Sequence, residues 1–412
     1  MFDVEKVRAQ FPALAREQGG RSAVYFDGPA GSQTPRRVAE AVSRYMLECN
    51  ANHGGVFATS RASDALLHEA HAAVADLLGA DDPDTVIFGP NMTTLTFALS
   101  RSLSRTWKRG DEIIVTRLDH DANVTPWVLA ARDAGAVVHH VGIKPDCTLN
   151  LTELQGRLSE RTRLVALGCA SNAVGTVNPF EEIVDWAHRV GALVFLDAVH
   201  YAPHRRIDVQ KWNCDFLACS AYKFFGPHVG VLWGRRELLE KLPAYKVRPA
   251  PDQLPGRWMT GTQNHEGIAG VLEAVEYLAD LGRQCQPHVN GRRAALAAAY
   301  SAIEKHEHGL ASRFLDGLAT LKPITLWGLG SAEQMRNRVA TFSITHAHLG
   351  PDEVARRLDQ EGIYAWHGNF YALSLSEALG REPDGMVRIG FLHYNTVAEV
   401  DRLLGALERM SS

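Results

Sequence analysis

Short apolar runs of the kind that form buried strands alternate along this chain with stretches of helical spacing. The apolar runs cover residues 86–88, 112–115, 137–141, 164–167 and 193–196. A repeated alternation of strand and helix favours a mostly parallel sheet with helices on both faces. We therefore predict an α/β fold in which functional side chains follow the carboxyl ends of the strands.

The pattern changes after about residue 269. Two long helical stretches, 270–281 and 292–307, lead into a mixed segment. The chain then ends in an apolar strand at 387–391 and a helix at 397–410. This order predicts a second, smaller α+β domain behind the first.

Composition narrows the classes of partner. The 412 residues are 46% hydrophobic and 22% charged, with a formal net charge of −4 and no basic tract, which argues against nucleic acid or an anionic membrane as partner. The first residues form no apolar signal core, and no apolar run approaches the length of a membrane span. The six cysteines are scattered without metal-ligand spacing, so we expect a reduced cytoplasmic protein without a metal site.

An aspartate and a lysine stand at the ends of two apolar runs. Asp197 directly follows 193–196, and Lys223 follows the next run with Ser220 and Tyr222 before it. Pyridoxal phosphate (PLP) chemistry requires a lysine that forms a Schiff base and a carboxylate that keeps the pyridine nitrogen protonated. The sequence thus predicts PLP as cofactor, with Lys223 and Asp197 in these two roles.

Other polar residues follow strands at the same predicted edge. His120 could stack on the cofactor ring and assist proton transfer, Thr93 begins a helix that could seat a phosphate, and Asn172 and His200 could face the ring. Each also fits an ordinary helix cap, loop or turn. Arg388 lies within an apolar strand, where it requires an anion, either a substrate α-carboxylate or an internal carboxylate.

Taken together, these segments resemble the class V aminotransferase family of fold-type I PLP enzymes, and within it the cysteine desulfurase-like branch. The matching residues are 25–30, 119–123, 126–127, 171–172, 175–176, 197–200, 220–223, 226–227, 261–262, 388 and 394–396. The resemblance implies a mostly parallel, seven-stranded type of sheet in a large domain of residues 25–268. It further implies an N-terminal segment, 1–24, that packs with the small domain, and linking helices with a small α+β domain at 269–412.

The resemblance also implies residue roles. Lys223 would carry the cofactor, Asp197 would pair with its pyridine nitrogen, and His120 would stack on its ring. The other cofactor-binding residues would be Met92, Thr93, Asn172, His200, Ser220, Tyr222, Gly261 and Thr262. The 261–262 segment is expected to reach the phosphate of the neighbouring subunit, which implies a homodimer with shared active sites. Arg388 would hold the substrate carboxylate.

The chain departs from the desulfurases at the position of their catalytic cysteine, which reads here as Tyr371. No cysteine lies beyond Cys285, and a persulfide needs a nucleophilic sulfur. We therefore predict a desulfurase-like enzyme of the C–S lyase or desulfurase type that acts on an amino acid without a persulfide cysteine. Tyr371, His367 and Asn369 are the candidate residues at the substrate end.

Three alternatives stay open from the sequence. A class V aminotransferase or amino-acid epimerase would use the same cofactor residues. A desulfurase could pass sulfur to a thiol of an acceptor protein. A non-catalytic scaffold has no chemical reason to keep Lys223, Asp197 and Arg388 together. A metal hydrolase is rejected, because no histidines join a carboxylate cluster with ligand spacing.

Overall fold

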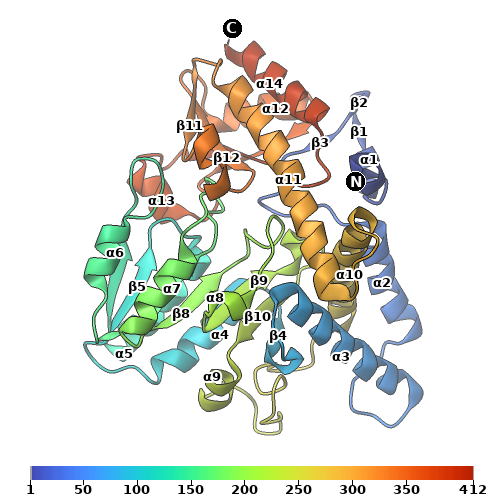
Figure 1. Ribbon diagram of the computed structural model, residues 1–412, viewed down its shortest axis with the longest axis vertical. Coiled ribbons are helices and arrows are strands. Elements are labelled where there is room, and N and C mark those ends of the chain that lie inside the picture. The colour runs from blue at the N-terminus through green and yellow to red at the C-terminus, as the bar shows by residue number, and fades with distance from the viewer. Residues whose placement is uncertain (1, 412) are drawn as a thin grey trace.

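A seven-stranded sheet forms the centre of the larger part of the molecule (Figure 1). The computed structural model describes residues 2–411. The sheet order is β4 (Val86–Gly89), β10 (Gly230–Gly234), β9 (Phe216–Ser220), β8 (Leu193–Asp197), β7 (Thr162–Gly168), β5 (Glu112–Thr116) and β6 (Val137–Val141). Strand β10 is antiparallel to both neighbours and all other pairs are parallel. The predicted mostly parallel sheet is confirmed.

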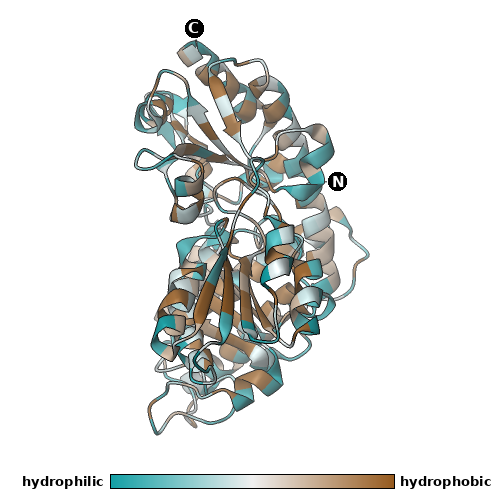
Figure 2. Ribbon diagram, turned by 90° about the vertical axis from the view of Figure 1, so that its left-hand side faces the viewer, coloured by the Kyte–Doolittle hydropathy of each residue, from teal (hydrophilic) through white to brown (hydrophobic). Residues whose placement is uncertain are grey.

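The strands are apolar at successive positions because helices cover both faces of the sheet. Along β8, Val194 and Leu196 join the core on one face, whereas Phe195 joins the core on the other. Figure 2 shows apolar strands between two layers of helices.

The short helices of this part are α4 (Met92–Ser104), α5 (Thr125–Ala134), α6 (Leu151–Arg157), α7 (Phe180–Arg189), α8 (Val209–Trp212) and α9 (Arg236–Lys241). Single-turn 3-10 helices are η2 (Pro83–Thr85), η3 (Asp121–Asn123) and η4 (Ala221–Lys223).

A second, antiparallel sheet forms the smaller part of the molecule. Its order is β11 (Ile324–Trp327), β12 (Thr341–His346), β15 (Met386–Gly390) and β14 (Trp366–Gly368). It has its own apolar core, to which α12 (Pro351–Gln360), α14 (Val397–Ser411) and the end of α11 (Arg292–Leu318) contribute. The 3-10 helix η5 (Ala332–Asn337) and α13 (Leu373–Ala378) lie in its connections. Its α+β composition agrees with the pattern predicted after residue 269.

Long helices and the N-terminal segment join the two parts. Helix α10 (His265–Cys285) packs against α2 (Arg36–Glu48), α3 (Ala58–Leu78) and α11, and α11 continues into the smaller part (Figure 1). After α1 (Val4–Arg8), η1 (Pro12–Ala15), β1 (Glu17–Gln18) and β2 (Arg21–Ser22), strand β3 (Val24–Tyr25) pairs in parallel with β13 (Ile363–Tyr364). The domain boundaries at residues 24 and 268 stay predictions.

The helices between residues 2 and 411 include none that is both long enough and apolar enough to cross a membrane.

Candidate active site

Five strand ends of the large sheet meet at one pocket. The pocket is lined by Asn91, Met92, Thr93, Asp119, His120, Ala122, Gly168, Ala170, Asn172, Asp197, Val199, His200, Ser220, Tyr222 and Lys223. These residues follow or end β4, β5, β7, β8 and β9. Parallel strands present their carboxyl ends at one edge, which is why residues more than 100 positions apart in the sequence share this pocket.

Lys223 lies in the turn η4 at the end of β9 and is buried. Its Nζ donates to the backbone carbonyls of Pro29 and of Ala30, the latter at 3.0 Å. Burial, reinforced by the positive charge of Arg388, lowers the pKa of Lys223 to about 7. Near pH 7 a large fraction of this amine is therefore neutral, and the neutral amine is the nucleophile that a Schiff-base lysine requires.

Asp197 ends β8 and accepts a hydrogen bond from the Val199 N–H at 2.8 Å. Burial raises the pKa of Asp197 to about 6, and the nearby Lys223 opposes the rise. The carboxylate is therefore still mostly ionised at neutral pH. A buried anion of this kind is suited to pair with a protonated ring nitrogen.

A second buried aspartate, Asp119, holds the turn that carries His120. Asp119 accepts from the Thr116 hydroxyl at 2.5 Å and from the Gly168 N–H. Burial, with the Asp197 charge as a smaller cause, raises the pKa of Asp119 to about 7. The residue was part of the sequence motif but not a predicted site residue. Its only sequence signal is a carboxylate three residues after a strand.

His120 lies against this turn with one face toward a tyrosine. Its Nδ1 accepts from the Ala122 N–H at 3.0 Å, and its ring stacks on Tyr371 with centroids 5.4 Å apart. Burial first, then the charges of Lys223 and Arg388, lower the pKa of His120 to about 4. The neutral ring is therefore available for stacking on a planar cofactor.

The start of α4 offers a place for a phosphate. The Met92 N–H donates to Ser220 Oγ at 3.1 Å, and Asn91 caps the helix by accepting from the Thr94 N–H at 2.9 Å. Thr93 is exposed at this helix start, beside the pocket. The N-terminus of a helix of this length, 13 residues, attracts anions.

Arg388 on β15, in the smaller sheet, contacts Asn172 of this pocket. Its Nη1 donates to the Asn172 carbonyl at 2.9 Å, and the Phe370 ring lies 4.2 Å from its guanidinium carbon. Burial lowers the pKa of Arg388 to about 9. Within residues 2–411 the guanidinium forms no ion pair shorter than 4.0 Å, so the internal salt bridge allowed by the sequence is not formed.

Asp27 is a site residue that sequence reasoning did not single out. Burial raises the pKa of its carboxyl group to about 6, and the positive charges of Arg388 and Lys223 oppose the rise. It precedes Pro29 and Ala30, whose carbonyls hold Lys223. It is distant from both charged residues in the sequence, which explains why no spacing pattern revealed it.

Several buried polar atoms around this pocket have no partner within the described chain. They are Asn172 Oδ1, His200 Nδ1, Arg388 Nε and Asp27 Oδ1. Buried polar atoms are nearly always hydrogen-bonded, so these four indicate that a polar molecule belongs here. A flat cofactor with a phosphate, a ring hydroxyl and a ring nitrogen fits this donor and acceptor set.

The loop at the substrate end is fastened to the turns of the large sheet. Tyr371 accepts at its carbonyl from the Asp121 N–H at 2.7 Å, and Phe370 accepts from Asn172 Nδ2 at 2.9 Å. Both loop residues have positive φ, 59° and 58°, a conformation that costs free energy in non-glycine residues. The Tyr371 side chain is 73% exposed.

The other predicted substrate residues lie further out. Asn369 shapes the loop, because it accepts from the Tyr371 N–H at 3.1 Å and donates to Glu382 at 3.1 Å. His367 is exposed on β14 and is not among the residues that line the pocket. A substrate role for either residue stays a prediction.

Gly261 and Thr262 are not brought into this pocket by a single chain. Both are exposed, and they line a different hollow together with His53 and His265. Their predicted contact with a neighbouring subunit stays a prediction. Among residues 2–411, no group of three or more histidine, cysteine or acidic side chains is arranged to hold a metal ion.

Known proteins resemble this chain over its whole length. The family model described as "Aminotransferase class-V" matches residues 24–403. A "Probable cysteine desulfurase" of Halalkalibacterium halodurans is 32% identical and covers 99% of this chain and 98% of its own. "Aminotransferase-like protein FGM3" of Gibberella zeae is also 32% identical, with the same two coverages. The apo structure of a cysteine desulfurase from Thermococcus onnurineus NA1 superposes with a TM-score of 0.88 at 28% identity, over 98% of this chain and 97% of that one.

Proposed function

The chain belongs to the class V aminotransferase family, and from this premise we propose that it releases sulfur from an L-amino acid by β-elimination, as a C–S lyase of the desulfurase type. The predictions of a desulfurase-like, fold-type I enzyme with PLP as cofactor are confirmed by the family match and the similar structures. The reaction and the roles of individual residues are the proposal.

One observation supports the proposal most directly. Lys223 and Asp197 line one pocket, and Arg388 donates to the carbonyl of Asn172, which also lines it. The loop beside this pocket carries Tyr371 instead of a thiol. When bound, PLP supplies an electron sink for the charge left on the substrate α-carbon. Asp197 would hold the protonated ring nitrogen, His120 would cover one face of the ring, and the start of α4 with Ser220 would hold the phosphate.

The residues of the chain then divide the work on the substrate. Arg388 would hold the α-carboxylate through its guanidinium and so orient the substrate for Lys223. Neutral Lys223 Nζ removes the α-proton, and the β-substituent leaves with the electron pair of the C–S bond. For cysteine, water completes the balance: cysteine and water give pyruvate, ammonia and hydrogen sulfide.

Tyr371 is the reason for preferring elimination to persulfide transfer. A phenol oxygen cannot accept a sulfur atom as a persulfide, and no cysteine follows Cys285 in the sequence. Sulfur therefore has to leave as free sulfide or pass to an external thiol. We propose the first route.

Product analysis tests this proposal. Purified holoenzyme is mixed with a panel of amino acids that includes L-cysteine, while sulfide, pyruvate, alanine and other keto acids are measured. Sulfide and pyruvate in equal amounts, with little alanine, support elimination. Alanine in place of pyruvate, or a keto acid formed without sulfide, would instead identify a desulfurase or an aminotransferase.

The Tyr371→Cys variant sharpens the product test. If the loop has the position of a desulfurase loop, the new thiol should take sulfur and shift the product from pyruvate toward alanine. Tyr371→Ser removes the same ring without adding a thiol and serves as the matched control. A shift that is equal in both variants would show that loss of the ring, and not gain of a thiol, changes the product.

We further propose a homodimer with shared active sites. The exposed segment 261–262 would reach the phosphate of the neighbouring subunit's cofactor. The exposed apolar side chains of Val56, Phe57 and Val247 lie on the same part of the molecule and support a surface there that the second subunit covers.

Analytical ultracentrifugation gives the mass of the assembly. Mixing Lys223→Ala chains with Thr262→Asp chains tests site sharing, because a mixed dimer keeps one site intact only if Thr262 acts on the other subunit.

A further inference from the structure

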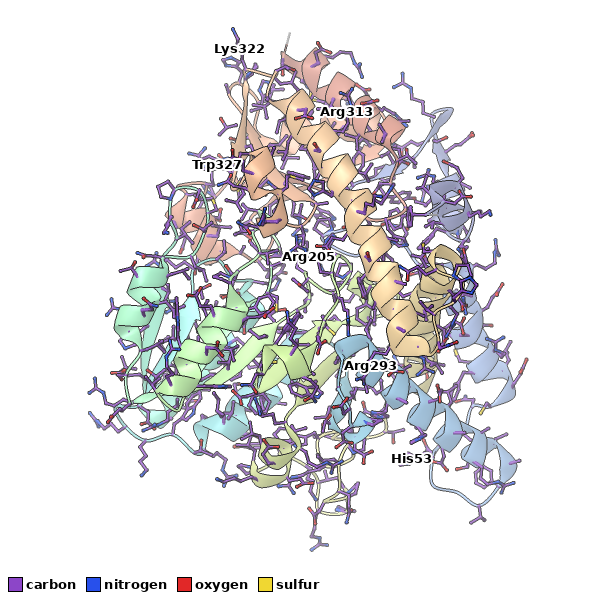
Figure 3. All side chains as sticks on the ribbon, in the orientation of Figure 1. His53, Arg205, Arg293, Arg313, Lys322 and Trp327 are labelled. Atoms are coloured by element: carbon purple, nitrogen blue, oxygen red, sulfur yellow. The ribbon has the colours of Figure 1, made fainter. Side chains whose placement is uncertain are left out.

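A second cavity lies behind the cofactor pocket, between the two parts of the molecule. It measures about 360 Å³ and is lined by the loop after β8, one side of α11 and the segment from Met335 to Ala340. Figure 3 labels Arg205, which lies beside α11 at this cavity. None of the residue roles described above uses this cavity.

The floor of the cavity is a buried carboxylate with one free oxygen. Glu307 on α11 is 4% exposed, and its Oε2 lies 2.7 Å from Nδ1 of the equally buried His204. Its Oε1 is buried and has no hydrogen-bond partner in residues 2–411. A buried carboxylate oxygen requires a donor, and both Glu307 and His204 line the cavity.

The walls of the cavity are positively charged. Arg338 is buried and donates only to backbone carbonyls, those of Leu329, Val174, Val339 and Thr341. Lys305 and Arg336 stand exposed at the rim. Within the described part of the chain, none of these three cations forms an ion pair shorter than 4.0 Å, whereas the fourth, Arg205, is paired with Glu304 at 3.0 Å.

From this arrangement we propose that the cavity binds a small carboxylate that also carries a hydroxyl or amino group. The carboxylate groups would lie toward Lys305 and Arg336, and the donor would satisfy the free oxygen of Glu307. A simple anion would pair with Lys305 and Arg336 at the rim. It would also bring a negative charge toward Glu307 without donating a hydrogen bond to the free oxygen of that residue. A ligand with both groups complements the whole cavity.

The site lies one side chain away from the cofactor pocket. The His204 ring packs edge-on against His200, with centroids 5.3 Å apart. His200 lines the cofactor pocket and its Nε2 is 3.0 Å from the hydroxyl of Thr341 on β12. A ligand bonded to Glu307 would therefore change the surroundings of His204 directly beside a residue of the active site.

L-Malate and succinate form a matched pair of probes, because they share two carboxylates and differ by one hydroxyl. Calorimetric titration of the holoenzyme should show malate binding at least about tenfold more tightly than succinate, the change expected when one hydrogen bond to a charged group is lost. Equal affinities would contradict the contact with Glu307. Absence of binding by either probe would overturn the site.

Two variants locate the binding. Lys305→Glu combined with Arg336→Glu changes exposed residues only, and it should weaken malate binding at least about tenfold. Arg388→Gln removes the carboxylate-binding group proposed for the active site and should leave malate binding unchanged. The opposite result, loss in Arg388→Gln and retention in the rim variant, would assign malate to the active site. The titrations need no turnover, so their outcome is independent of the elimination proposed above.

Discussion

The cofactor end and the substrate end of the active site are built in different ways. Lys223, Asp197 and His120 follow strands of the parallel sheet, so that the spacing of the strands fixes their mutual positions. Tyr371 belongs instead to a loop of the smaller part, which accepts two hydrogen bonds at its backbone carbonyls, one from the Asp121 N–H and one from the Asn172 side chain, and has a strained backbone. Substitutions of the residues that follow the strands should therefore change the rate of the reaction. Substitutions in the loop should change which product is formed or which substrate is used.

Loss of Lys223 should have the largest effect. Lys223→Ala removes both the Schiff-base amine and the proposed base, and proton transfer alone contributes about 10²- to 10⁴-fold to a rate. Sulfide release from L-cysteine should fall by at least that factor. Circular dichroism should show an unchanged fold, because a buried amine is costly and Lys223 is not part of either apolar core of the large sheet. Activity within tenfold of the wild type would remove Lys223 from the mechanism.

Loss of Arg388 should have the second-largest effect on activity. Arg388→Gln removes a charged hydrogen bond worth about 1.5–3 kcal/mol, or roughly 10- to 150-fold in kcat/KM. If the residue holds the α-carboxylate, binding of cysteamine, which lacks that group, should be nearly equal in wild type and variant. An equal loss for cysteine and cysteamine would instead mean that Arg388 supports the pocket through Phe370 and Asn172.

The lowered pKa of Lys223 predicts a pH dependence for cofactor uptake. Only the neutral amine attacks the PLP aldehyde, and the folded-state pKa is about 7 in place of 10.5. The rate at which the apoprotein takes up PLP should rise with pH through about 7 and then level off. Stopped-flow absorbance follows this rate, with Lys223→Ala as the blank. A rate that keeps rising toward pH 10 would mean that burial does not neutralise the lysine.

The residues that the sequence predicted at the ends of the parallel strands line one pocket in the structure, because they share a local pattern. Their roles stay predictions. Asp197 ends a strand, and His120 and Lys223 lie within four residues after one. The carboxyl edge of a parallel sheet gathers such residues. The sequence did not reveal Asp27 or the pair His204–Glu307, because these act through contacts between segments far apart in the chain. Thr262 is the opposite case: the sequence pointed to it, but its predicted partner is the phosphate of a neighbouring subunit, and one chain alone does not bring the two together.

Substitutions in the loop that carries Tyr371 should have the smallest effect on turnover. Tyr371→Phe keeps the ring that stacks on His120 and removes only the hydroxyl of a side chain that is 73% exposed. If the ring acts by packing, turnover of L-cysteine should change by less than about twofold, as for other exposed substitutions. Tyr371→Ala, which removes the stack as well, should cost more, about 0.5–1.5 kcal/mol for an aromatic pair. A loss in Tyr371→Phe as large as that in Tyr371→Ala would instead make the phenol a proton donor to the substrate, and the loop would then share in the chemistry now assigned to the strand ends.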